Sequence, residues 1–143
     1  MDIAAWLVRS GYRDDLSNTT GGATCDGVTH VAICAAAGAW GMACQQSASS
    51  KELDKWLAVG PVIAHVRHRA WSKPDSCKFT HAGHYIVIVG RASQAGVYNV
   101  SDPNSCKEQN THTTLQELSM GCSLVGFIRV HTSTQVPARE LVV

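Results

Sequence analysis

The fold is decided by Gly83-His84-Tyr85-Ile86-Val87-Ile88-Val89-Gly90 and, a few residues later, by Val97-Tyr98-Asn99-Val100-Ser101-Asp102-Pro103. Both stretches are rich in β-branched and aromatic residues, which favour strands. Ala95-Gly96 between them is typical of a hairpin turn. Because apolar residues follow one another without interruption from Ile86 to Val89, we expect this strand to be covered on both faces.

The hairpin brings two polar residues to one edge of the predicted sheet. In an antiparallel pair the start of the first strand lies beside the end of the second, so His84 and Asp102 are expected to come within reach of each other. A carboxylate beside an imidazole fixes its tautomer and favours its charged form, as a catalytic base requires. Gly83 lets the backbone approach closely at that point. The alternative is a strand-end histidine next to an ordinary Asp-Pro turn.

Composition and charge exclude several functional classes. The chain has 143 residues, which suits one domain, and a formal net charge of +1. Nucleic acids and anionic membranes reward clustered basic charge, so neither is expected as the main partner. The longest apolar run, residues 31–44, is too short to span a bilayer. No signal peptide is visible, which predicts a cytoplasmic protein or one exported without such a signal.

Helices are expected mainly before the sheet. The sequence predicts a helix over 2–11, a second that begins near Thr24 or Asp26 and ends at Gly38, and a third over 49–60 with a Ser49–Glu52 capping box. Strands are expected over 40–46, 61–67 and 124–130, with a short helix over 115–120 capped by Thr114 and Glu117. This order indicates an α+β domain over residues 1–132 and a C-terminal tail over 133–143.

Six cysteines occur in the chain, and no two of them form a Cys-x-x-Cys pair. Structural zinc of the usual spacing is therefore not indicated. A zinc site could instead be built from histidines and cysteines near the hairpin, namely His65, His68, His81, His84, Cys77 and Cys106. However, the spacing of His65 and His68 on a strand sends their rings to opposite faces. We expect no metal and no cofactor. Cys34 is interpreted as a buried thiol, and Cys77 and Cys106 as lying near the site or bonded to each other.

Several motifs together resemble those of a known family. They are the Asp2-Ile3-Ala4-Ala5-Trp6 helix, the Gly21-Gly22-Ala23-Thr24 loop, the Leu53-Asp54-Lys55-Trp56-Leu57 helix and Gly60-Pro61-Val62-Ile63-Ala64-His65-Val66, followed by the two strands quoted first. The sequence resembles the papain-fold cysteine peptidases of the double-glycine-leader (bacteriocin-processing) group from about Asp2 to Val130. That resemblance implies a papain-like α+β fold with N-terminal helices packed on an antiparallel sheet.

The resemblance also implies a function and a site. His84 would be the base and Asp102 the orienting acid of acyl transfer from a peptide or isopeptide carbonyl to a thiolate. Tyr85, Trp71 and Gly83 would contact a peptide or protein substrate. In the family the nucleophilic cysteine opens a helix that precedes the one beginning at Asp2, and here Met1 stands at that position.

The departure from the family pattern leaves alternatives open. The first is that the domain over 1–132 is N-terminally incomplete and that the nucleophile segment lies upstream in the native protein. Cys25 is the best substitute nucleophile, because the start of a helix favours a thiolate and the glycines ahead of it permit close approach. A partner segment or chain could instead supply the nucleophile helix. The other alternative is a module of the same fold that binds peptides without cutting them.

Overall fold

The computed structural model describes Trp6, Arg9, Ser10 and residues 29–68, 77–80, 83–104 and 110–132. In chain order the elements are α3 (His30–Ala39), β1 (Met42–Ser47), α4 (Ser50–Leu57), β2 (Val62–Arg67), β3 (Gly83–Arg91), β4 (Val97–Ser101), β5 (His112–Thr114), the π-helical turn η2 (Glu117–Gly121) and β6 (Ser123–Thr132). The predicted C-terminal tail, and most of the predicted helix over 2–11, lie outside the described residues. No helix in the described part of the chain is long and apolar enough to cross a membrane.

The strands form one six-stranded sheet in the order β1-β6-β2-β3-β4-β5. Every neighbouring pair is antiparallel. The hairpin predicted at Ala95-Gly96 joins β3 to β4, and Gly96 has a φ of 76°, a conformation that glycine adopts without steric cost. The predicted antiparallel sheet is therefore confirmed, with β3 near its centre.

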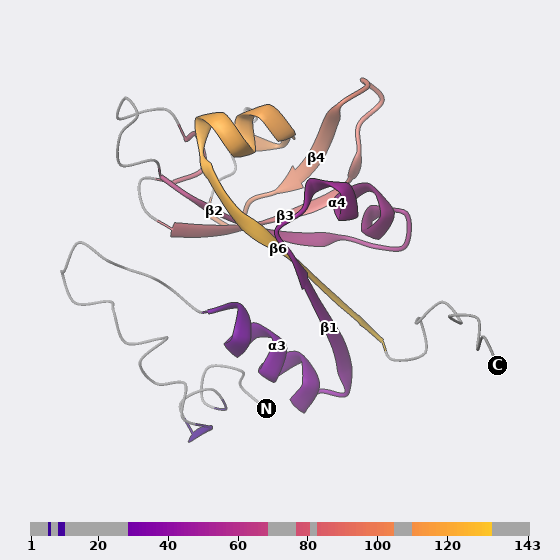
Figure 1. The fold of residues 1–143 in the computed structure, drawn as a ribbon, viewed down its shortest axis with the longest axis vertical. Coiled ribbons are helices and arrows are strands. Elements are labelled where there is room, and N and C mark those ends of the chain that lie inside the picture. Colours follow the sequence, from indigo (N-terminus) through magenta and orange to yellow (C-terminus); the bar gives the residue numbers. More distant parts are fainter. Residues whose placement is uncertain are drawn as a thin grey trace.

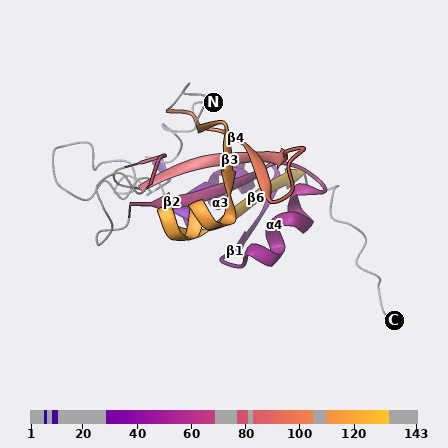
Figure 2. The ribbon, with the colours of Figure 1, turned by 90° about the horizontal axis from the view of Figure 1, so that it is seen from above.

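Helices cover the sheet on opposite faces. Figure 1 shows α3 on one side of the sheet, with α4 and the gold helical turn η2 on the other. In Figure 2, α4 and η2 lie together on one side of the strands, and α3 is seen behind the sheet. The core lies between the sheet and the two helical elements α4 and η2. Its largest fully buried side chains include Leu53, Ile86, Leu118 and Phe127. This arrangement is the α+β architecture that the sequence predicts.

The two faces of β3 differ, contrary to the prediction that both are covered. Ile86 and Ile88 point into the core and are fully buried, whereas Val89 on the opposite face is 54% exposed. Side chains alternate between the faces of a strand. An uninterrupted apolar run does not show how much of a strand is covered by a helix. Among the described elements α3 contacts mainly β1 and β6 rather than β3.

The N-caps of α4 and α3 can be compared with the predicted helix starts. α4 begins where predicted, and the Ser49 hydroxyl accepts a hydrogen bond from the Lys51 amide. α3 begins at His30 instead of near Thr24 or Asp26, because Thr29 is its N-cap and accepts from the Ala32 amide.

The short helix after β5 has a complete capping box. The Thr114 hydroxyl accepts from the Glu117 amide at 3.1 Å, and the Glu117 carboxylate accepts from the Thr114 amide at 3.1 Å. The predicted capping by Thr114 and Glu117 is confirmed. The helix then closes as a π-turn, with the Cys122 amide donating to the Glu117 carbonyl. Strand β5 just ahead of it was not predicted.

Four of the six cysteines form two disulfides, Cys34–Cys44 and Cys77–Cys122. The interpretation of Cys34 as a free buried thiol is therefore wrong. Of the two alternatives for Cys77, the bond to Cys106 is wrong because Cys77 bonds to Cys122, whereas a position near the site is not contradicted. Cys106 lies outside the described residues.

Truncating β3 side chains on its two faces is expected to have unequal effects. Ile86→Ala should lower the free energy of unfolding by about 3 kcal/mol, because it removes buried methylene groups and leaves a cavity. Val89→Ala, three residues away on the exposed face, should change it by less than about 0.5 kcal/mol. Urea unfolding followed by circular dichroism measures both. Equal losses in the two variants would contradict the burial described here.

Candidate active site

The candidate site is formed where β3 begins and β4 ends. Val87 pairs with Ser101 in the register of these strands, so the first residues of β3 lie beside the residues that follow β4. The Nε2 atom of His84 lies 2.7 Å from Oδ1 of Asp102. The side chain of His84 is 10% exposed and that of Asp102 is 1% exposed. The proximity predicted from the hairpin is confirmed.

The Asp102 carboxylate has a donor on each oxygen. Oδ1 accepts from His84 and also from the Asn104 amide at 3.0 Å, and Oδ2 accepts from Nδ2 of Asn110 at 3.3 Å. Burial acts to raise the pKa of Asp102, but the hydrogen bonds from His84, Asn104 and Asn110, with the charge of His84, outweigh it and hold this pKa below its ordinary value. Asp102 is therefore an ionised carboxylate at neutral pH.

The contact with Asp102 sets the tautomer of His84. An ionised carboxylate only accepts hydrogen bonds, so Nε2 of His84 carries the proton that it donates. In the neutral ring Nδ1 is then the acceptor, and it lies 3.4 Å from the side-chain nitrogen of Asn104. The pair thus presents an oriented imidazole whose second nitrogen can accept a proton.

An apolar groove lies on the α3 side of the sheet. Its volume is about 500 Å³, and it is lined by Ile33, Ala36, Ala37, Trp40, Met42, Ile63, Tyr85, Val87, Pro103 and Val130. Tyr85 and Pro103 each follow one member of the His84–Asp102 pair in sequence, so the groove extends to the neighbourhood of that pair. A pocket with apolar walls and a few convergent polar groups is typical of a binding site for a peptide or small molecule.

A pair of histidines, His30 and His65, lies next to Tyr85 and was not predicted. Nε2 of His30 is 2.9 Å from Nδ1 of His65, and the His65 ring stacks on Tyr85 with a centroid distance of 4.4 Å. Burial lowers the pKa of His30; Gln46 opposes this by a hydrogen bond, and the charge of Arg67 adds to it. These contacts fix the Tyr85 ring against β2.

The other predicted site residues are Gly83, Cys25 and Trp71. Gly83 is the exposed first residue of β3 and pairs with Arg67. Cys25 and Trp71 lie outside the described residues, as do His81 and Cys106 of the zinc alternative. The described residues contain no group of three or more histidine, cysteine or acidic side chains placed to hold a metal ion.

Asn104 and Asn110 were not identified from the sequence. Asn104 follows Asp102-Pro103, and its amide closes an Asx-turn, so the Asp-Pro-Asn motif contained a usable signal. Asn110 lies 8 positions from Asp102 in the sequence and carries no such signal.

Helices on both faces of an antiparallel sheet give an α+β domain of papain-like fold, with the imidazole–carboxylate pair where β3 begins and β4 ends. The chain is similar in structure to the peptidase domain of Streptococcus ComA, described as a bi-functional ABC transporter involved in a quorum sensing pathway. The two share 21% sequence identity and a TM-score of 0.54, over 91% of this chain and 87% of that chain. No family model and no curated protein matches the sequence. The fold class predicted from the sequence is confirmed.

Proposed function

We propose that this chain is a cysteine peptidase-like domain that acts on a peptide or isopeptide bond, with His84 as the base and Asp102 as its orienter. The observation that carries this proposal is the 2.7 Å contact between His84 Nε2 and an almost fully buried Asp102 carboxylate. The fold similarity to a peptidase domain supports the same reaction class.

In the proposed reaction Nδ1 of His84 takes the proton from a cysteine thiol. The thiolate attacks the substrate carbonyl carbon, and the imidazolium returns the proton to the departing amine as the C–N bond breaks. Water then hydrolyses the thioester, with His84 accepting a proton from the water, and regenerates the thiol. Asp102 keeps the proton on Nε2 and stabilises the imidazolium that forms.

The disulfides narrow the choice of nucleophile. With Cys34, Cys44, Cys77 and Cys122 in disulfides, the cysteines left as candidate nucleophiles in this chain are Cys25 and Cys106. We propose Cys25, because Gly21 and Gly22 ahead of it permit close backbone approach. The argument from a helix start does not apply, since α3 begins at His30 with Thr29 as its N-cap. A thiol supplied by a partner segment or chain is the alternative source.

The apolar groove favours a second candidate function, a module that binds peptides without cleaving them. Its wall includes Tyr85, one of the predicted substrate contacts, and Pro103 beside Asp102. Gly83 and Trp71 complete the proposed peptide contacts. An extended peptide with apolar side chains would bury them in this groove.

Iodoacetamide labelling at pH 5, with each cysteine measured by mass spectrometry, tests the proposed reaction. Only a cysteine held as thiolate reacts quickly at that pH. Fast labelling of Cys25, with Cys106 as the internal slow reference, and cleavage of members of a peptide library would support a peptidase. Slow labelling of both cysteines together with no cleavage would contradict catalysis by this chain alone. Calorimetric binding of library peptides without turnover would then favour the binding module.

A further inference from the structure

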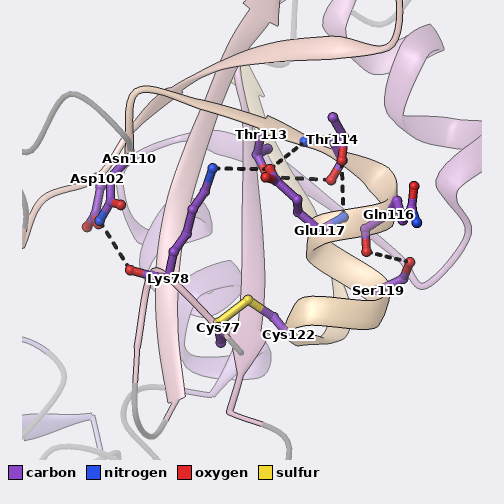
Figure 3. Close-up of a disulfide and its surroundings, with 10 residues drawn as sticks. All are labelled: Cys77, Lys78, Asp102, Asn110, Thr113, Thr114, Gln116, Glu117, Ser119 and Cys122. Carbon is purple, nitrogen blue, oxygen red and sulfur yellow. Dashed lines mark hydrogen bonds and ion pairs between the residues drawn. A yellow bond between two sulfur atoms is a disulfide. The ribbon is translucent and has the colours of Figure 1, made fainter. Parts of the chain in front are cut away.

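Asn110 connects the candidate site to a rigid part of the fold. The residue is 5% exposed, and its side-chain amide nitrogen lies 3.3 Å from Asp102 Oδ2 and 3.3 Å from the Lys78 carbonyl oxygen. An amide nitrogen carries two hydrogens, so it can donate to both acceptors. Figure 3 shows Asn110 beside Asp102, with its dashed contact to Lys78.

The orientation of this amide follows from its neighbours. Both acceptors are oxygens, one of them charged, and rotating the amide by 180° would place the Asn110 oxygen against the Asp102 carboxylate and the Lys78 carbonyl. Two pairs of acceptors facing each other are unfavourable in a buried position. The nitrogen of Asn110 must therefore face Asp102.

The Lys78 carbonyl is itself held in place from several directions. Cys77 is bonded to Cys122 at the end of η2 (Figure 3), and Phe79 on the other side is buried. The Lys78 ammonium group donates to the His112 carbonyl at 2.7 Å and forms an ion pair with Glu117 at 3.1 Å. The backbone at Lys78 is thus a fixed anchor point for Asn110.

We propose that Asn110 is a positioning residue that holds the Asp102 carboxylate against His84, with the disulfide-anchored Lys78 carbonyl as its own support. The inference rests on the proposed function, since it assigns a role within the His84–Asp102 pair. Oδ1 of Asp102 has two donors, whereas Asn110 is the one donor to Oδ2 among the described residues. Without it, Oδ2 is a buried charged atom with no donor in the described part of the chain, and the carboxylate loses one of the three hydrogen bonds that orient it toward Nε2.

The Asn110→Ala variant tests this role, with Asn99→Ala as the matched control. Asn99 also donates its side-chain amide to a backbone carbonyl, that of Arg91, but it does not contact Asp102. A ¹³C-detected titration of the carboxyl groups should show that the pKa of Asp102 rises in Asn110→Ala, because a donor to its ionised form is lost, and does not move in Asn99→Ala. Ring ¹⁵N shifts of His84 should change from the Nε2–H tautomer to a mixture.

The reactivity of the thiol gives a second, independent readout. If the domain is active, the labelling or turnover rate should fall roughly 10- to 100-fold in Asn110→Ala, since small misplacements of a catalytic group have effects of this size. An unchanged Asp102 pKa and an unchanged His84 tautomer in the folded variant would overturn the proposal. The NMR readouts require no catalysis, so absence of a reactive thiol with these shifts present would count against the proposed function alone.

If Asn110→Ala does not fold, a measurement on the unmodified protein tests the proposed role of Asn110. The side-chain NH₂ resonances of Asn110 should shift as Asp102 titrates, because they donate to its carboxylate. Those of Asn99 should not follow that titration. Asn110 resonances that stay unchanged through the Asp102 titration would overturn the proposal.

Discussion

Replacing His84 with alanine is expected to lower peptide turnover by roughly 10²- to 10⁴-fold, the range that a general acid–base group contributes. Without the imidazole, no neighbouring base takes the thiol proton and no acid protonates the departing amine. The same variant should slow iodoacetamide labelling at pH 5 by roughly 10- to 100-fold. An ordinary thiol is ionised to less than about 0.1% at that pH, and the weaker nucleophilicity of an acidic thiolate offsets part of the difference.

A matched control tests whether the removal of a different histidine side chain has the same effect on turnover and labelling. His112→Ala removes an exposed imidazole on β5, whose ring contacts the neighbouring Thr111 and not Asp102. Its turnover and labelling rates should match those of the unmodified protein. Equal rates for His84→Ala and the unmodified protein would contradict the assignment of His84 as the base.

Asp102→Asn should also impair the site, for a reason specific to this structure. The new amide can offer its oxygen to His84 only by turning its own nitrogen toward the nitrogen of Asn110, where two donors would face each other. The opposite rotamer satisfies Asn110 but presents a donor to Nε2 of His84, which disfavours the Nε2–H tautomer. Either orientation loses the carboxylate charge that stabilises an imidazolium.

The sequence was most informative where signals are local. The two strand-forming stretches and the Ala95-Gly96 turn of the β3–β4 hairpin were sufficient to predict that His84 and Asp102 meet, because antiparallel register follows from a short connection. The capping signals at Ser49 and Thr114 located two helix starts for the same reason. The predicted Ser49–Glu52 capping box is nevertheless wrong, because the Ser49 hydroxyl accepts from the Lys51 amide and the Ser49 amide donates to the Ser47 hydroxyl.

Non-local contacts account for most of what was missed. The Cys77–Cys122 bond joins residues 45 positions apart, and its pairing depends on how η2 packs against the start of the 77–80 segment. The His30–His65 contact spans two elements that no sequence pattern relates. Asn110 reaches Asp102 only after the chain has returned to the sheet. Such contacts are set by tertiary packing, which neither periodicity nor capping signals encode.

The site combines the His84–Asp102 pair, in which His84 lies on the same face of β3 as the core residues, with an apolar groove on the α3 face of the sheet. His84 follows the alternation of Ile86 and Ile88, whereas Tyr85 and Val87 line the groove. A peptide in that groove would run close to the edge where His84 and Asp102 meet. This arrangement supports both proposed functions, and the presence of an activated thiol is the property that separates them.

Removing the Cys77–Cys122 disulfide is expected to lower the free energy of unfolding by about 4 kcal/mol, and removing Cys34–Cys44 by about 3 kcal/mol. A cross-link stabilises mainly by restricting the unfolded chain, and the two bonds close loops of different length, with sequence separations of 45 and 10. Urea unfolding of the double variants Cys77→Ala/Cys122→Ala and Cys34→Ala/Cys44→Ala measures both effects. A larger loss for the shorter loop would contradict the entropic argument, and a loss below about 1 kcal/mol for either would indicate that the bond does not constrain the unfolded chain.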